Sequence, residues 1–285
     1  MDDEGKRHVL SPMSAPVSVI IPCYRCRGTI ERALRSVLWQ SVRPEEVLMI
    51  EDGSGDGGRT LSLLHHLKQR HEGKVEIKVL ALRENRGAAV ARNTGWEAAR
   101  RPFVAFLDAD DAWHPRKIEI QYNWMKHRPE AALSGHPRLF VREDEGICAL
   151  PDQWSARPVS AGRLLFRNWF FTSCVMLRRD IPFRFDPAKR YSEDYLLWLK
   201  ILLSGYRGRR LELPLGFCFK PDFGSSGLSG DLWRMEKGEL DTYGRLCREG
   251  LISPLLLPLL YFLSLAKYLR RVAIASLRKN GHGFV

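Results

Sequence analysis

The stretch Phe103–Asp111, FVAFLDADD, decides the fold. Its first part, Phe103–Leu107, is a continuous apolar run that predicts a strand buried on both faces, and an acidic cluster follows directly. Three strand-and-helix units precede it, and Pro115 opens a further predicted helix that ends near Arg128. Alternating strands and helices with short connections predict an α/β fold, with a mostly parallel sheet covered by helices on both faces.

The units upstream of this stretch have clear boundaries. Their strands are Val17–Pro22, Val47–Ile50 and Val75–Leu80. Their helices run from Ile30 to Gln40 with Thr29 as the cap, from Leu61 to Arg70, and up to Ala99 after a loop that begins at Gly87. Ligands of such sheets bind beyond the carboxyl ends of the strands. Polar residues lie at these ends, namely Tyr24, Asp52, Asp108 and Asp110.

The second half of the chain is less regular. Its predicted elements are a strand at Thr172–Leu177, a helix at Asp194–Leu203, one or two strands within Gly208–Lys220 and a helix from Leu232 to Cys247. We therefore expect a flexible N-terminus at 1–15, two halves of one domain at 16–130 and 131–230, and a helical C-terminal extension at 231–285.

The composition is that of a folded, basic protein. Hydrophobic residues make up 45% and charged residues 27% of the 285 residues, which excludes a largely disordered chain. Lys and Arg outnumber Asp and Glu by 45 to 33, a net charge of +12. This surplus suggests a polyanionic partner, which can be a phosphorylated ligand, an anionic membrane or nucleic acid. Nucleic acid is disfavoured, because the sequence contains no zinc-finger, helix-turn-helix or RNP-like pattern.

The cysteines and the N-terminus point to the cytoplasm. The six cysteines are scattered and several lie in apolar runs, which is typical of reduced, buried thiols. The first 16 residues lack the apolar core of a secretory signal. No uninterrupted run of about 18 uncharged apolar residues occurs, so we expect no simple transmembrane helix.

The acidic end of the fourth strand is a candidate metal site. Alternate residues of an extended segment point the same way, so Asp108 and Asp110 can present two carboxylates to one Mg²⁺ or Mn²⁺ shared with substrate phosphates. The alternative is that Asp110 or Asp111 only caps the turn that follows.

Two glycine-containing loops lie at the same edge. Glu51–Gly58, EDGSGDGG, contains a literal G-x-G-x-x-G, but carboxylates directly before it would repel a pyrophosphate. We interpret it as an acid, Asp52, at a strand end that accepts hydrogen bonds from a base or ribose, followed by a tight turn. Asn85–Gly95 places Gly87 before a helix that carries Arg92, which is a possible anion site. The alternatives are a plain turn and a surface helix.

The segment Tyr191–Lys200, YSEDYLLWLK, supplies a candidate general base. Asp194 lies at the start of an apolar helix and, in the functional interpretation, faces the site as the base. In the alternative interpretation, Ser192 caps the helix and the acids only favour its first turn.

The last 35 residues have a distinct character, with five Lys or Arg and no Asp or Glu after Leu251. On a helix, four of the basic residues lie within about 100° of one another. They are Lys267, Arg270, Arg271 and Arg278, and the residues opposite are Phe262, Leu265, Ala266, Leu269, Val272 and Ala273. This pattern is typical of a helix in a membrane interface. The alternative is a helix that packs on its own domain or on a dimer partner.

Read together, these segments resemble glycosyltransferase family 2 over roughly Val17–Leu203. The matching segments are VSVIIPCY, SVLWQS with VLMIEDGSGDG, NRGAAVARNTG, FLDADDAWHPRKI and SEDYLLWLK. The resemblance implies a GT-A fold and an inverting, metal-dependent transferase that uses a nucleotide sugar, with a UDP-sugar as the expected donor. It also implies that 16–130 binds this donor and that 131–230 binds the acceptor.

The resemblance implies roles for individual residues. The catalytic base is Asp194, and the Mn²⁺ or Mg²⁺ ligands are Asp108 and Asp110. The expected nucleotide-binding residues are Pro22, Tyr24, Asp52, Gly87, Arg92, Asp108 and Ala109. A candidate lid over the diphosphate consists of Lys220 and the loop 222–230, with Ser225 and Ser226. The chain departs from the family pattern at Glu51, where an Asp is usual, and at Arg25, where an Asn is usual.

The bacterial relatives that the sequence resembles build surface polysaccharides on a polyprenyl diphosphate carrier. This implies a lipid-linked saccharide acceptor and a peripheral location on the cytoplasmic face of the inner membrane, where each Lys or Arg near an anionic leaflet contributes about 1 kcal/mol of binding. Two other hypotheses are a non-catalytic sugar-nucleotide-binding or membrane scaffold protein and a D-x-D phosphatase. The phosphatase is disfavoured, because Ala112 stands where that family has Thr or Val.

Overall fold

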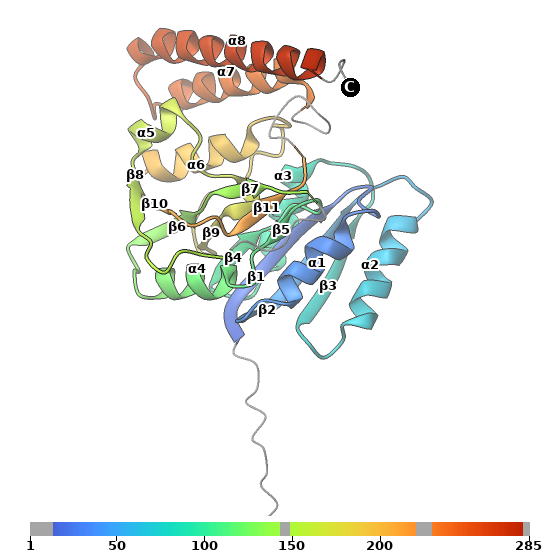
Figure 1. Ribbon diagram of the computed structural model, residues 1–285. Coiled ribbons are helices and arrows are strands. Elements are labelled where there is room, and N and C mark those ends of the chain that lie inside the picture. Colours follow the sequence, from blue (N-terminus) through green and yellow to red (C-terminus); the bar gives the residue numbers. More distant parts are fainter. Residues whose placement is uncertain (1–13, 143–148, 221–229, 282–285) are drawn as a thin grey trace, which may run out of the picture.

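An eight-stranded sheet runs through the centre of the computed structural model, which describes residues 14–142, 149–220 and 230–281, with side chains up to Leu277 (Figure 1). Its strands lie in the order β3-β2-β1-β4-β9-β6-β10-β8. Their bounds are β1 (Ser14–Cys23), β2 (Arg43–Asp52), β3 (Glu76–Leu82), β4 (Phe103–Phe106), β6 (Ala131–Gly135), β8 (Ala156–Val159), β9 (Met176–Arg178) and β10 (Arg207–Leu211).

The strands of the first half pair in parallel, as their apolar runs predict. Ile20 of β1 lies beside Leu48 of β2 and beside Phe106 of β4. Because all of these strands run in the same direction, their carboxyl ends, with the polar residues that follow, reach one edge of the sheet. The antiparallel strand β9 then separates this part from the parallel pair β6–β10.

Helices cover both faces of the sheet, which confirms the predicted layers. Consecutive residues of β1 belong to different cores, since Ile20 shares a cluster with Trp96 and Ile21 shares one with Leu34. The helices are α1 (Ile30–Leu38), α2 (Arg59–Arg70), α3 (Ala88–Ala98), α4 (Lys117–Lys126), α5 (Ala161–Phe166) and α6 (Glu193–Leu203). Residues of α1, α2 and α4 pack in one core and residues of α3, α5 and α6 in the other, so the strands need apolar residues on both sides.

A second, three-stranded sheet lies beside the carboxyl edge of the first. It consists of β5 (Ala112–Trp113), β11 (Gly216–Cys218) and β7 (Arg138–Phe140), in the order β5-β11-β7. β5 directly follows the acidic cluster and β11 directly precedes Phe219 and Lys220, so this small sheet brings the two segments together.

The predicted start of α1 at Ile30 is correct, but its side-chain cap and its end are not. Thr29 does not cap α1 with its side chain, because its hydroxyl donates to the Cys26 carbonyl. The helix ends at Leu38, not at Gln40, whose amide instead accepts from the Ile118 N–H and donates to the His114 carbonyl. A contact 78 residues away in the sequence therefore decides where this helix ends.

The predicted strand Thr172–Leu177 is only half correct. Its first residues form a 3₁₀ turn, η1 (Thr172–Cys174), and β9 begins at Met176. The turn is held from outside, since Trp113 Nε1 donates to the Ser173 carbonyl over 2.6 Å. Likewise Pro115 does not open α4, which begins two residues later at Lys117.

Two helices follow the sheet: α7 (Leu232–Arg248) and α8 (Leu257–Gly281), joined through the 3₁₀ turn η3 (Pro254–Leu256). Figure 1 shows them side by side, with α8 as the outermost layer and α7 between it and α6. Among the described residues, no helix is long and apolar enough to cross a membrane.

Candidate active site

A cleft of about 870 Å³ lies at the carboxyl ends of β1, β2 and β4. Its other wall comes from the start of α6 and from α7 and α8. The structure brings most of the predicted site residues to this cleft. They are Pro22, Tyr24, Asp52, Arg92, Asp108, Ala109, Asp110, Asp194 and Lys220. At the position predicted for Gly87 the wall is formed by Ala88, and Ser225 and Ser226 lie outside the described residues.

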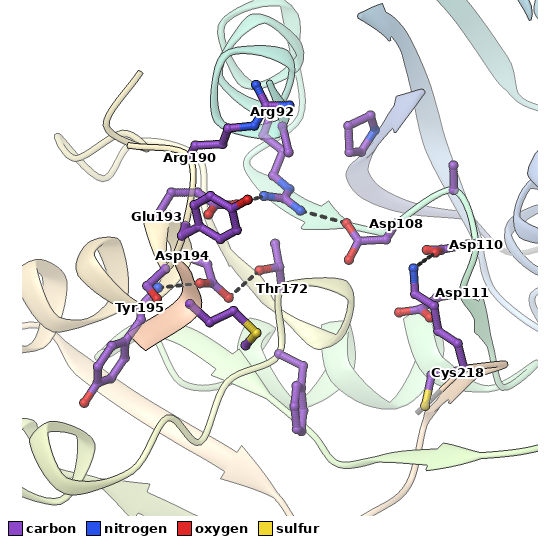
Figure 2. A pocket seen from close by; sticks show the side chains of 18 of the residues that line it. Arg92, Asp108, Asp110, Asp111, Thr172, Arg190, Glu193, Asp194, Tyr195 and Cys218 are labelled. Carbon is purple, nitrogen blue, oxygen red and sulfur yellow. Dashed lines mark hydrogen bonds and ion pairs between the residues drawn. The ribbon is translucent and has the colours of Figure 1, made fainter. Parts of the chain in front are cut away.

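Arg92 connects the two walls of the cleft (Figure 2). Its guanidinium donates to Asp108 Oδ1 and to Glu193 Oε1, both over 2.8 Å, and its side chain is only 7% exposed. Burial disfavours the charge of Arg92, but the two neighbouring carboxylates outweigh burial and raise its pKa. The bridge therefore joins the end of β4 to the start of α6.

Glu193, the acid beside the predicted base, is almost completely buried. Burial raises the pKa of its carboxyl to about 7, and the charge of Arg92 opposes this shift. The sequence analysis noted Glu193 only as part of the E-D pair. Its partner, Arg92, lies 101 residues away in the sequence, and no local sequence pattern indicates such a pair.

Asp194 points into the cleft from the first turn of α6. The Thr172 hydroxyl donates to its Oδ2 over 2.9 Å, and the Tyr195 N–H donates to its Oδ1 over 2.7 Å. The alternative interpretation, in which Ser192 caps α6, does not hold. Ser192 lies in the left-handed region at φ 56° and its side chain accepts no hydrogen bond from the helix. Sequence reasoning missed Thr172, which it had placed in a strand.

Asp52 organises the loop before α3. Its carboxylate accepts hydrogen bonds from the Arg86 and Gly87 N–H groups over 2.8 and 2.9 Å, and from the Asn85 side chain. Burial raises the pKa of Asp52, while these backbone donors lower it. Gly87 has φ 86° and ψ 163°, a combination that residues with a side chain rarely adopt, which explains a glycine at this point.

The two departures from the family pattern have structural explanations. Glu51 accepts from the Gly53 and Ser54 N–H groups and so shapes the turn after β2. A side chain at Gly53 would lie 2.2 Å from the Glu84 carbonyl carbon. Arg25 has φ 48°, a region where Asn is common, and two hydrogen bonds to Ser54 hold it there.

The acidic segment after β4 has three differently paired carboxylates. Asp108 pairs with Arg92, and Asp110 pairs with the Lys220 ammonium group at the end of the small sheet. Asp111 is buried and pairs with Arg138 over 3.1 Å; burial and the charge of Asp108 raise its pKa to about 7. Both Asp110 and Asp111 thus line the cleft, and Asp111 is the more deeply buried of the two.

The residues present fit a hard divalent cation that is shared with a substrate. Among the residues that the structure describes, no three His, Cys, Asp or Glu side chains cluster closely enough to hold a metal ion. Mg²⁺ and Mn²⁺ in nucleotide enzymes commonly take one or two carboxylates and complete their shell with phosphate oxygens and water. The Lys220 ammonium group already places a positive charge beside the Asp110 carboxylate, as a bound cation would.

Solved structures share this architecture. Mannosyltransferase PcManGT from Pyrobaculum calidifontis, in complex with GDP-Man and Mn²⁺, matches 95% of this chain and 76% of its own length with a TM-score of 0.64 and 20% identity. A fragment of Staphylococcus aureus TarS, residues 1–349, in complex with UDP-GlcNAc, matches 81% of this chain with a TM-score of 0.63 and 19% identity. This chain spans 66% of that fragment. Both matches show the GT-A fold.

Curated relatives share more of the sequence. The Bacillus subtilis protein TuaG, whose name assigns it to teichuronic acid biosynthesis, is 44% identical over 67% of this chain and 73% of its own. The Escherichia coli protein WfgD is 30% identical over 80% of this chain and 85% of its own. It is named as a UDP-Glc:alpha-D-GlcNAc-diphosphoundecaprenol beta-1,3-glucosyltransferase.

The family model "Glycosyl transferase family 2" matches residues 18–189, more than half of the chain. This range contains most of β1, all of β2, β3 and β4, the acidic segment and Arg92, and it ends just before Glu193 and Asp194. The chain belongs to glycosyltransferase family 2.

Proposed function

We propose that this protein transfers a sugar, with inversion at the anomeric carbon, from a UDP-sugar to a lipid-linked saccharide acceptor during synthesis of a surface polysaccharide. The observation that carries the proposal is the placement of Asp194 and of the Arg92–Asp108 pair around one cleft. The names of relatives support the donor and acceptor classes, since WfgD acts with UDP-Glc on a sugar diphosphoundecaprenol.

Asp194 is the proposed base. Its carboxylate accepts the proton of an acceptor hydroxyl while the hydroxyl oxygen forms a bond to the anomeric carbon. The bond from that carbon to the phosphate oxygen breaks at the same time, and the nucleoside diphosphate leaves with the electron pair. The Thr172 hydroxyl and the Tyr195 N–H hold the carboxylate in place, which restricts its orientation before the reaction.

The opposite wall would bind the donor. Tyr24 and Pro22 offer an apolar surface for the base, and Asp52 holds the loop that carries Ala88 toward the nucleotide. Asp108 and Asp110 would hold Mg²⁺ or Mn²⁺, which when bound supplies positive charge to the departing diphosphate. Lys220 is the candidate for a further diphosphate contact, together with the loop 222–230.

We further propose that the protein works at the cytoplasmic face of the membrane, because its acceptor would be anchored there. The cleft supports this placement, since its wall opposite the nucleotide includes Lys267 and Arg271 of the C-terminal helix α8. A phosphate-bearing acceptor would meet these cations on the side of the cleft that is remote from Tyr24.

The test is a donor and acceptor screen. Purified protein with Mn²⁺ or Mg²⁺ is incubated with single nucleotide sugars and a synthetic polyprenyl-diphosphate sugar, and release of nucleoside diphosphate is measured. We expect one UDP-sugar to be used and Asp194→Asn to lower turnover about 10²- to 10⁴-fold, the usual contribution of a general base. The matched control is Asp180→Asn, an exposed aspartate paired with Arg178, which should leave turnover unchanged.

Two outcomes would contradict the proposal. One is equal turnover in wild type and Asp194→Asn, which would remove this residue from the role of base. The other is UDP binding without turnover of any donor, which would favour the sugar-nucleotide-binding scaffold.

A further inference from the structure

The outermost helix, α8, exposes one row of apolar residues, while Leu260 and Tyr261 on its other side pack against the core. Phe262, Leu269 and Leu277 are 68%, 65% and 71% exposed. Other large apolar residues on or just before the helix are also exposed, namely Leu255, Leu259 and Leu265. The spacing of these residues, in steps of three, four or eight positions, places them on one helix face. We call this face the outer stripe and define it by Leu255, Leu259, Phe262, Leu265, Leu269 and Leu277.

The opposite side of α8 carries charge and contacts α7. Arg271 donates to Glu236 Oε2 over 2.6 Å, and Ser264 donates to the other oxygen of this fully buried carboxylate over 2.7 Å. Lys267 pairs with Glu239. The basic face expected to lie on a membrane is therefore divided, because Lys267 and Arg271 are occupied inside the protein while Arg270 is exposed.

This arrangement differs from that of an ordinary surface helix. Such a helix buries its apolar stripe and exposes its charges, because that removes apolar surface from water. Here α8 buries Leu260 but also turns Lys267 and Arg271 inward, and their pairs to Glu239 and Glu236 favour a rotation that leaves the outer stripe exposed. A helix held with an apolar stripe outward marks a surface that a partner covers.

The charge around the stripe indicates the partner. The sequence has no Asp or Glu from 250 to 285, and Arg270 is exposed beside the stripe. A surface of exposed Leu and Phe with only basic charged residues is complementary to an anionic bilayer, whose headgroups attract cations and whose acyl chains accept apolar side chains. At 1.5 Å per residue the 25 residues of α8 offer about 37 Å of helix to lie flat on such a surface.

The stripe and the cleft lie on opposite sides of the same helix. Lys267 and Arg271 line the acceptor side of the cleft, while Phe262 and Leu269 face outward. We propose that the outer stripe docks on an anionic membrane surface, with Phe262, Leu265 and Leu269 inserted in the interface, so that the cleft lies about one helix diameter from the lipids. Docking would bring a lipid-linked acceptor close to Asp194, and this part of the inference rests on the proposed function.

The test uses the full chain and vesicles. Wild type and the double variant Phe262→Ser/Leu269→Ser are sedimented with vesicles of phosphatidylglycerol and phosphatidylcholine, and with phosphatidylcholine alone. We expect wild type to bind the anionic vesicles, and the double variant to bind them at least tenfold more weakly. The matched control Trp39→Ser removes an equally exposed aromatic residue at the end of α1, remote from α8, and should bind like wild type.

Unfolding and activity measurements separate this proposal from the proposed function. Because both residues are exposed, the double variant should unfold at the same temperature as wild type and keep its release of UDP without a lipid acceptor, while transfer to an acceptor in vesicles falls. Failure of the proposed function would instead abolish UDP release in wild type and leave vesicle binding intact.

Three results would overturn the docking proposal. The first is no binding of wild type to anionic vesicles, and the second is equal vesicle binding by the double variant. The third is a dimer of wild type in solution that the double variant loses while neither binds vesicles, because a second copy would then cover the stripe.

Discussion

The central sheet buries mainly apolar side chains, whereas the α7–α8 pair buries ion pairs as well. In the sheet, Ile20 and Ile21 point to apolar cores on the two faces, and the acids of the cleft's nucleotide side, Asp52, Asp108 and Asp110, lie where strands end. In the helix pair, Glu236 is buried against Arg271, while Phe262 faces outward. The difference teaches that one chain can use apolar burial to build a scaffold and buried ion pairs to orient a surface.

Arg92 should show the largest effect, because it is the buried charge on which both walls of the cleft depend. Replacing it with Met leaves Asp108 and the buried Glu193 without their shared cation. We expect Arg92→Met to lower the free energy of unfolding by about 3–5 kcal/mol, measured by urea titration. Adding Glu193→Gln should recover part of this loss, since it removes the unpaired charge. A loss below about 1 kcal/mol would mean that the bridge contributes nothing to joining the two walls.

Lys117 is an exception within the sheet region, and removing it should stabilise the protein. It is fully buried on α4, its ammonium group has no hydrogen-bond partner, and it lies 3.6 Å from the centre of the Trp113 ring. Burial lowers its pKa from 10.5 to about 7. Between pH 10.5 and pH 7, Lys117 is protonated in the unfolded chain but still neutral in the folded chain. The free energy of unfolding therefore falls as the pH falls through this range.

The variant Lys117→Met should thus raise the free energy of unfolding at pH 7 by about 4 kcal/mol, and the gain should shrink toward pH 10.5. Urea titrations of wild type and variant at pH 7, 8.5 and 10 measure this. An unchanged or lowered stability at pH 7 would show that Lys117 is compensated inside the protein, and the contrast between sheet and helix pair would weaken.

The ion pair between α7 and α8 should show the smallest net effect, provided that both partners are changed. Arg271→Met alone leaves Glu236 buried without its cation and should lower stability by about 2–3 kcal/mol. The double variant Arg271→Met/Glu236→Leu should lie within about 1 kcal/mol of wild type, because apolar residues of similar size commonly replace a buried pair without loss. A double-mutant cycle by thermal or urea unfolding measures both. If the double variant is as unstable as the single one, the pair contributes stability as well as orientation.

The comparison also explains which parts of the structure the sequence could predict. Strands β1, β2 and β4 have apolar residues on both faces, and this continuous pattern predicts them with the acids at their ends. Gln40 and Thr172 were placed wrongly because contacts from distant segments, Ile118 and Trp113, decide their local structure. The periodicity of α8 predicted the apolar row with Phe262 and Leu269, but it grouped Arg270 with Lys267 and Arg271, which the structure separates. Periodicity also does not say which face meets the protein. That depends on Glu236 and Glu239 of a different helix.

The bridge through Arg92 has a consequence for how such enzymes can be recombined. Arg92 belongs to the half of the domain that would bind the donor, and Glu193 begins the helix that carries the proposed base. The two halves are therefore not independent modules. A hybrid that takes the residues after 131 from a relative keeps this ion pair only if the relative also has a carboxylate at the position of Glu193. We therefore expect exchange of the acceptor-side half between such proteins to depend on one ion pair between the two halves.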